Sequence, residues 1–546
     1  MTHTQVLIAG AGPVGLTAAL ELRRRGVDCR VVDRLPERLP HSRAVGITPR
    51  TLEIWDRMGV VRAALDAAVP VHGQLVYADG AQQQHVELAL PPEVPYGFAA
   101  LPQCETERVL EERLAQHGAA VARGTELVSF TQDADGVTSV LRTADGGLTE
   151  VRSEFLVGCD GAHSTVRKGL GLAFEGGAFP EEYMLADVEL DWDLPAGYVV
   201  RALHRAADGS VDDSLVCVPL PGPCRYRVAT RVPPELRSPR AEEPGTARTR
   251  QAEEEEHGFE MPQAPRTEHI EAALKRLSPV PVAASTMRWS SVYRVSHRIV
   301  DRYAEGRVFV AGDAAHIHPP TGAQGMNTGI QDAHNLAWKL ALTVQGIGQP
   351  RLLESYGTER RPVGQEVVSR TVRHATRGYG SEGETDAATV VLGEAQLLVS
   401  YRGSPVVEPS ADGPGPAAGD RAPDCGGLRD RITTHPLRLY DLLRGRDHVL
   451  LLYADAREQL DGFDELTDEA GNVARGALVC YALLAPDVDA SDLMTPVIRD
   501  GGGEFRRAYG AEGATALLIR PDGHLAARTA PAGHVGVLAA LTRVFA

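Results

Sequence analysis

The stretch VLIAGAGPVGLTAAL, residues 6–20, decides how the rest of the chain is interpreted. Its apolar character fits either an export signal or a buried strand that passes through a glycine turn into a helix. A signal peptide needs a basic segment before its apolar core, yet MTHTQ precedes this one and Gly12-Pro13 interrupts it. We therefore interpret the stretch as strand, turn and helix.

The turn has the spacing of a dinucleotide-binding motif. Gly10, Gly12 and Gly15 follow the apolar run 6–9 directly, and CRVVD predicts a second strand that ends in Asp33. The first glycine permits the tight turn, the second lets the backbone approach a pyrophosphate, and the third lets helix and strand pack closely. Asp33 follows at about the 20-residue offset expected of the carboxylate that binds a ribose hydroxyl. These residues alone do not decide whether the bound dinucleotide is FAD, NAD or NADP.

Composition narrows the classes of protein that the chain can belong to. Its 546 residues and 43% hydrophobic content predict several domains with large cores, and a net charge of −17 argues against a nucleic-acid partner. Seven cysteines without a CxxC pair argue against a disulfide framework or a zinc site and favour the reducing cytoplasm. Since no apolar run reaches about 18 residues, we expect no membrane span.

Two further motifs place an acid directly after an apolar strand. FLVGCDG carries Asp160, and VFVAGDAAH carries Asp313. Open α/β sheets bind ligands at the carboxyl ends of their strands, so both acids are candidate ligand contacts. The loop HPPTGAQGMN follows and predicts a helix that begins at Gly325, Met326 and Asn327. Its positive end would stabilise negative charge on a ligand.

In these motifs and their order the sequence resembles the single-component FAD-dependent aromatic hydroxylases, the class of para-hydroxybenzoate hydroxylase and phenol hydroxylase, and especially the hydroxylases of aromatic polyketides. The resemblance covers residues 1–175 and 285–370. It implies that Asp160 serves both FAD and the nicotinamide donor, and that Asp313 binds the ribityl chain of FAD. Arg43 would contact the cofactor, and Gln103 its flavin side.

The candidate site residues fall into two groups. The cofactor-binding candidates are Gly10, Gly12, Pro13, Gly15, Asp33, Arg34, Arg43, Gln103, Asp160, Gly161, Gly312, Asp313, Pro320, Gly325, Met326 and Asn327. Trp289 and Tyr293 are candidates to border the substrate pocket. His316 and His318 have no companion ligand in the sequence, so we expect no metal site.

The resemblance implies a monooxygenase in which NADPH or NADH reduces FAD transiently. A flavin C4a-hydroperoxide would then transfer oxygen from O2 to a phenolic or polyketide-derived aromatic molecule. No second GxGxxG follows a strand, so we predict no separate nicotinamide domain. Baeyer–Villiger or another ring-modifying oxidation by the same intermediate is one alternative, and a non-catalytic flavin-binding accessory protein is another. No catalytic side chain is identified.

The predicted fold is α/β with an insertion and an additional C-terminal domain. Residues 1–175 and 286–400 would form a discontinuous Rossmann-like FAD-binding domain, and 176–285 an antiparallel-sheet substrate domain. The Pro/Gly-rich stretch 401–424 is interpreted as a linker. Residues 425–546 resemble the thioredoxin-like domain of phenol hydroxylase-type enzymes without a CxxC, which suggests a structural or oligomerisation role; a homodimer is one compatible assembly.

Overall fold

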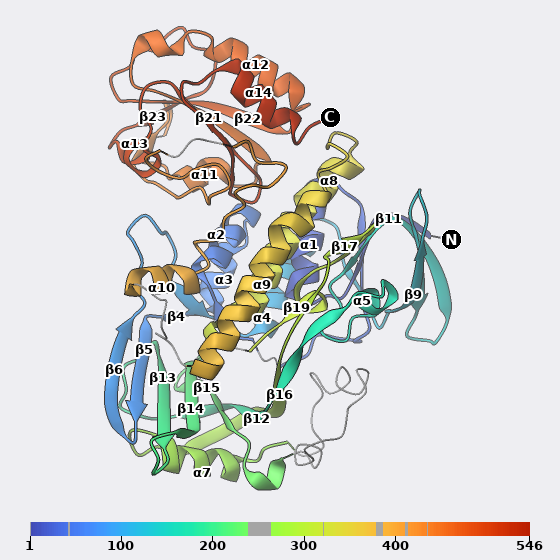
Figure 1. Ribbon diagram of the computed structural model, residues 1–546, viewed down its shortest axis with the longest axis vertical. Helices are drawn as coiled ribbons and strands as arrows, with labels where there is room; N and C mark the ends of the chain where they lie inside the picture. Colours follow the sequence, from blue (N-terminus) through green and yellow to red (C-terminus); the bar gives the residue numbers. More distant parts are fainter. Residues whose placement is uncertain are drawn as a thin grey trace.

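The computed structural model describes residues 2–41, 44–237, 264–319, 321–377, 386–409, 413–433 and 435–546. Two of the candidate residues, Arg43 and Pro320, lie outside these ranges. Figure 1 shows a central α/β layer, with an antiparallel sheet and α7 below it and a C-terminal α/β unit above it. Within the described residues, no helix is long and apolar enough to cross a bilayer.

The central sheet has the order β17-β18-β11-β1-β2-β8, and β10 and β9 extend it beside β11. The pairs that join β18, β11, β1, β2 and β8 are all parallel. Its strands are β1 (Thr2–Ala9), β2 (Cys29–Asp33), β8 (Val121–Arg123), β9 (Glu126–Gln132), β10 (Val137–Arg142), β11 (Leu148–Gly158), β17 (Ala304–Glu305) and β18 (Val308–Val310). Each acid motif follows a strand, as the sequence predicts, and the structure shows that these two strands are parallel neighbours.

The βαβ unit at the start of the chain is confirmed. α1 (Pro13–Arg23) begins directly after the turn, with Pro13 in its first turn, where a missing N–H costs nothing. Gly10 has φ +99°, and a Cβ at Gly15 would lie 1.9 Å from the carbonyl oxygen of Gly10. Only glycine therefore permits this approach of helix to strand. α1 packs against α4 (Gln103–Gln116) and α8 (Gln324–Val344).

The second sheet has the order β19-β16-β12-β15-β14-β13-β5-β6. Its strands are β5 (Gly73–Ala78), β6 (Ala81–Glu87), β12 (Phe174–Leu190), β13 (Tyr198–Arg205), β14 (Val211–Pro219), β15 (Arg225–Arg231), β16 (Ala284–Val300) and β19 (His316–Ile317). The antiparallel strands expected between 176 and 285 are present, and the sheet also takes β5, β6, β19 and most of β16 from outside that range. One face packs on α7 (Thr267–Leu277) through alternate apolar residues. The other face is free to form a cavity wall.

The C-terminal unit is built on a sheet of order β20-β23-β22-β21-β24-β25. Its elements are β20 (Leu428–Arg429), α11 (Leu439–Leu443), β21 (His448–Ala454), α12 (Phe463–Val473), β22 (Leu478–Leu484), β23 (Val497–Asp500), α13 (Glu504–Tyr509), β24 (Thr515–Ile519), β25 (Leu525–Thr529) and α14 (His534–Thr542). Every residue of β21 is buried, because the strand is central and covered on both faces. The segment HVLLLYA forms β21, and β24 and β25 pair as an antiparallel hairpin next to it.

The remaining elements connect these units. They are β3 (Gly46–Ile47), α2 (Pro49–Met58), α3 (Val61–Ala67), β4 (Val69–Val71), β7 (Phe98–Ala100), α5 (Thr165–Gly169), η1 (Pro234–Leu236), η3 (Gly312–Ala314), η4 (Thr321–Ala323), α9 (Glu354–Arg377), α10 (Ala387–Glu394) and η5 (Arg457–Leu460). β3, β7 and β4 form a small sheet of their own. α9 packs against α8 and β16 and so joins the central layer to the second sheet.

Candidate active site

A large cavity of about 1830 Å³ lies between the central layer and the second sheet. It exceeds the roughly 300–1,000 Å³ of a site for one drug-sized ligand, so it has room for a cofactor and a substrate together. The candidates that line it are Gly10, Gly12, Pro13, Asp33, Arg34, Gln103, Asp160, Gly161, Trp289, Tyr293, Asp313, Gly325 and Met326. Gly15, Gly312 and Asn327 are not part of its wall, because they pack within the protein.

At one end of the cavity the glycine turn and Asp33 are bonded to one another. The Ala11 amide donates to Oδ2 of Asp33 at 2.7 Å, and the Leu35 amide donates to its Oδ1 at 2.9 Å. A Cβ at Gly12 would meet no atom of the described residues within 4 Å. The turn therefore presents open backbone at the N-terminus of α1, which fits a pyrophosphate beside a ribose.

Asp160 lines the cavity, but its carboxylate is also used by the fold. Oδ1 accepts from the Ser164 hydroxyl at 2.5 Å, and Oδ2 accepts from the amides of Thr165 and Val166 at 2.7 and 3.1 Å. These donors belong to the first turn of α5, so Asp160 satisfies amides that have no partner within the helix. Burial raises the pKa of Asp160, and its hydrogen bonds act in the opposite direction.

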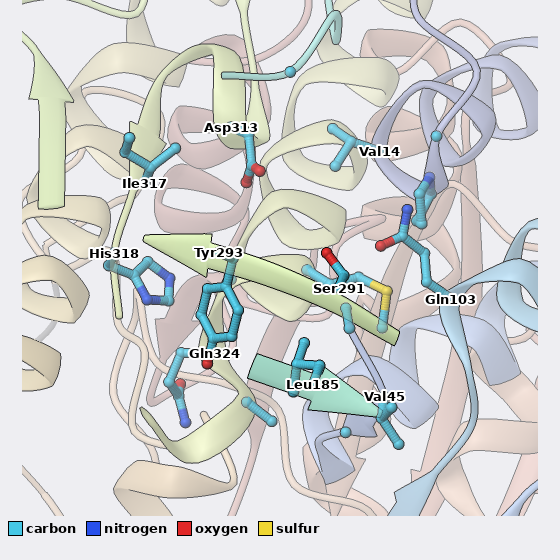
Figure 2. Close-up of a pocket in the computed structure, with 18 of the residues that line it drawn as sticks. Val14, Val45, Gln103, Leu185, Ser291, Tyr293, Asp313, Ile317, His318 and Gln324 are labelled. Carbon is cyan, nitrogen blue, oxygen red and sulfur yellow. The ribbon is translucent and has the colours of Figure 1, made fainter. Parts of the chain in front are cut away.

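Asp313 differs, because its side chain is exposed to the cavity. Figure 2 shows Asp313 directed into this space, with Val14 nearby. It belongs to η3, which follows β18 as the sequence predicts. Gly312 begins that turn with φ +60°, and a Cβ there would lie 2.8 Å from a methyl group of Val14. Glycine therefore lets the turn approach the start of α1.

The predicted helix after the Pro/Gly loop is confirmed as α8. Gly322 and Ala323 have φ +70° and +56°, and this left-handed pair turns the chain into the helix. Gly325 and Met326 line the cavity, so the first turn of α8 presents its positive end there. The side chain of Asn327 is buried instead, and its Nδ2 donates to the carbonyl of Gly46 at 2.9 Å. This bond connects the start of the helix to β3.

The second sheet supplies the aromatic wall of the cavity. Trp289 and Tyr293 of β16 both line it, and the Tyr183 and Tyr293 rings lie 5.9 Å apart. Figure 2 shows Ser291 and Tyr293 of β16, Leu185 of β12, His318 and Gln324 around the same space. Sequence reasoning missed Arg201 and Arg231, which line the same face. In β13 and β15 these arginines alternate with buried residues, and this alternation indicates that they lie on the cavity face of the sheet.

Gln103 lies at the start of α4, and its amide donates to Oε1 of Glu107 at 2.8 Å. Both side chains line the cavity. Burial raises the pKa of Glu107, which the hydrogen bond from Gln103 opposes. Sequence reasoning missed Glu107, although it lies one helical turn after Gln103 and shares its face.

Sequence reasoning also missed Asp332, a fully buried carboxylate in the middle of α8. It contacts His316, whose Nε2 lies 2.8 Å from Oδ2 of Asp332. An acid within an otherwise buried helical stretch is rare unless it is paired, and that was the available signal. Among the described residues no group of three metal-ligating side chains comes together.

Comparison with known proteins gives consistent relatives. A family model described as FAD binding domain matches residues 3–371. A flavin-dependent monooxygenase of Mycobacteroides abscessus is 33% identical over 536 residues, which covers 96% of this chain and 97% of that protein. The 6-methylpretetramide 4-monooxygenase of Streptomyces rimosus is 34% identical and covers 98% of this chain and 93% of its own.

Two solved structures extend the likeness over the whole chain. The flavin-dependent monooxygenase PieE in complex with FAD and substrate has a TM-score of 0.78 and 25% identity, with 99% of each chain covered. Aklavinone-11 hydroxylase with FAD and aklavinone has a TM-score of 0.77 and 26% identity, with 100% of this chain and 99% of that chain covered. The chain belongs to the FAD-binding domain family. Within it, the protein is a flavoprotein monooxygenase whose cofactor is FAD and whose reductant is NAD(P)H.

Proposed function

We propose that the enzyme uses O2 to hydroxylate an extended, electron-rich aromatic molecule, either a phenol or a polyketide-derived ring system. One observation carries the proposal: the cavity that begins at the glycine turn continues without a partition to the aromatic face of β16. The relatives act on substrates of this kind, since they include a 6-methylpretetramide 4-monooxygenase and a pentachlorophenol 4-monooxygenase.

Each part of the cavity has a proposed role. Asp33 and the Gly10–Gly12 turn would hold the ribose and pyrophosphate of FAD, and Asp313 would accept hydrogen bonds from its ribityl hydroxyls. When bound, FAD supplies the hydride chemistry with NAD(P)H and the activation of O2. The amides at the start of α8 would stabilise negative charge on the bound flavin ring.

The chain's contribution at the substrate end is orientation and exclusion of water. Trp289 and Tyr293 hold an aromatic ring against the second sheet, while Arg201 and Arg231 favour substrate oxygens that carry negative charge. The apolar side chains that share this face limit water in the cavity. These groups position the ring and do not form covalent bonds with it.

We propose that the second sheet is the substrate domain, which extends the predicted range 176–285 by the strands β5, β6, β16 and β19, and that residues 425–546 form a thioredoxin-like unit. Cys425 and Cys480 are free cysteines and form no CxxC pair, so this unit has a structural role rather than a disulfide-exchange role. A cytoplasmic location suits the free thiols, and a homodimer is the assembly that we propose.

The experiment is a screen of phenolic and polycyclic aromatic compounds for stimulated NADPH and NADH oxidation by the purified holoenzyme. Compounds that stimulate oxidation are then turned over in labelled O2, and their products are weighed by mass spectrometry. One labelled oxygen on an intact ring supports hydroxylation, whereas a labelled lactone or ring-expanded ester indicates Baeyer–Villiger insertion. Label from water, or NAD(P)H oxidation that no aromatic compound stimulates, would contradict the proposal.

A further inference from the structure

Buried polar contacts surround the Gly312–Asp313 turn, and the roles proposed above make no use of them. At their centre is Asp332 of α8. Its Oδ2 accepts a hydrogen bond from the Gly312 amide at 3.2 Å and lies 2.8 Å from Nε2 of His316. Its Oδ1 accepts from Nε of Arg360 at 2.7 Å. One carboxylate thus bonds both ends of the segment that carries Asp313.

The packing around this segment leaves it little freedom. A Cβ at Gly329 would lie 3.0 Å from the Cα of Gly312, so α8 approaches the turn backbone to backbone. Asp332 follows Gly329 at a spacing that places both on one face of the helix. α8 therefore holds the turn in two ways. Gly329 packs closely against it, and Asp332, on the same face of the helix, accepts a hydrogen bond from it.

Arg360 connects Asp332 to a further layer. Its Nη1 donates to Oη of Tyr401 at 2.9 Å, and its Nη2 donates to the carbonyl of Thr328 at 3.2 Å. The Tyr401 ring in turn lies 4.2 Å from the ring of His524, which belongs to the C-terminal unit. The Gly312–Asp313 turn and the C-terminal unit are thus connected by an unbroken path through Asp332, Arg360, Tyr401 and His524.

A second link lies beside the first. Glu359, the neighbour of Arg360 on α9, accepts two hydrogen bonds from Arg520 of the C-terminal unit at 2.6 and 2.8 Å, and one from Lys339 at 2.7 Å. All three charged groups are fully buried. Because an unpaired buried charge is costly, the position of α9 depends on this docking.

The charge on Asp332 is what makes its bond to the turn strong. Burial would raise the pKa of this carboxyl, but Arg360 and His316 lower it below its ordinary value, so the group stays ionised. A hydrogen bond from an amide to a carboxylate is roughly twice as strong as one between neutral groups. Replacing the carboxylate by an amide therefore weakens the attachment while keeping the side-chain shape.

We infer that Asp332 is a positioning residue that fixes the Gly312–Asp313 turn for FAD, and that the C-terminal unit holds it in place through Tyr401 and Arg360. The C-terminal unit thereby acts on the cofactor site although it contributes no residue to the cavity wall among those described. This inference rests on the proposed role of the turn in the flavin cradle.

The test compares Asp332→Asn with Glu53→Gln. Glu53 is also fully buried and also bonded by two arginines, Arg50 and Arg421, but it makes no contact with the turn. FAD affinity is measured by titrating the apoprotein, and the visible spectrum of bound flavin is recorded. Hydrogen exchange is measured on the peptide that contains Gly312. We expect Asp332→Asn to weaken FAD binding about tenfold, alter the flavin spectrum and speed exchange at Gly312.

Glu53→Gln should lower the melting temperature without changing these three quantities by more than about twofold. Equal effects of the two variants, or no effect of Asp332→Asn on any of the three, would overturn the inference. If wild-type protein itself binds no FAD, the proposed function fails and not this inference alone.

Tyr401→Phe provides a milder second variant, which decides the matter if Asp332→Asn does not fold. It removes only the hydroxyl that accepts from Arg360 and keeps the ring against His524. We expect FAD binding weaker by about threefold and faster exchange at Gly312. Wild-type affinity and wild-type exchange in Tyr401→Phe would overturn the path through Arg360.

Discussion

Asp160 and Asp313 follow neighbouring parallel strands in the same sheet, yet the protein uses them differently. The carboxylate of Asp160 bonds to three groups of the segment that follows it, from the Ser164 hydroxyl to the Val166 amide. The carboxylate of Asp313 faces the cavity, and Asp332 from another helix holds its turn. The comparison teaches that an acid at a strand end can stabilise the fold or face the ligand, depending on what supports the turn.

The largest expected effect is on stability, in Asp160→Ala. The variant removes the acceptor of three hydrogen bonds at the start of α5, so we expect a loss of about 3 kcal/mol in the free energy of unfolding, measured by urea denaturation. Asp145→Ala is the control, because Asp145 also bonds to its own loop, at Thr143 and Gly147, but is exposed. Similar small losses in both variants would mean that Asp160 is not a structural group.

The next effect tests the residue that bridges the two turns. Arg167 is buried and donates to the carbonyl of Ala162 at 2.7 Å and to that of Ala314 at 3.4 Å. Arg167→Met should lower the free energy of unfolding by about 2 kcal/mol and also weaken FAD binding, because each carbonyl loses a donor. In Arg307→Met, which removes a guanidinium beside Phe155 on the same sheet, FAD binding should not change. Unchanged FAD affinity in Arg167→Met would show that the turn of Asp160 does not affect the turn of Asp313.

A third prediction concerns ligand binding alone. Asp313→Ala should weaken FAD binding about tenfold, or about 1.4 kcal/mol, because an acceptor for ribityl hydroxyls is lost. The free energy of unfolding of the apoprotein should stay within about 0.5 kcal/mol of wild type, since the side chain is exposed. The measurements are FAD titration and urea denaturation of the same preparation. A large stability loss with normal FAD affinity would reverse the roles of the two aspartates.

The smallest expected effect is a pH dependence of the free energy of unfolding, and it involves His318, which follows the Asp313 turn in the sequence. Burial lowers the pKa of His318 from 6.5 to about 4, and His316 and Arg370 act in the same direction. The unfolded chain takes up this proton near pH 6.5, while the folded protein does not until about pH 4, so stability is lost as the pH falls between these values. Between pH 7 and 5.5, His318→Gln should lose about 1 kcal/mol less than wild type. Parallel losses would show that His318 does not contribute.

Local patterns in the sequence were enough to predict the strands that end at Asp33, Asp160 and Asp313, and the helix that starts near Gly325. Each of these signals lies within a few residues of the feature that it marks. The bonds between Asp160 and the start of α5 could also have been predicted, because Ser164 lies where a helix cap is expected. They were missed because the motif was interpreted only as a ligand contact.

The supports of the site could not be predicted in the same way. The bond from Arg360 to Tyr401 joins residues 41 positions apart, and the bond from the Asp332 carboxylate to Gly312 spans 20. No periodicity or spacing rule connects such residues, since their meeting depends on how α8, α9 and the C-terminal unit pack. The strand pairing of β5 with β13 likewise depends on tertiary structure.

The ion pair between Glu359 and Arg520 also affects the order in which contacts can form while the chain is synthesised. The two residues are 161 positions apart, so at roughly 5–20 residues per second the ribosome adds Arg520 about ten to thirty seconds after Glu359. Throughout that interval α9 carries a carboxylate whose arginine partner does not yet exist. The contact that docks α9 on the C-terminal unit therefore forms only after that unit has been synthesised.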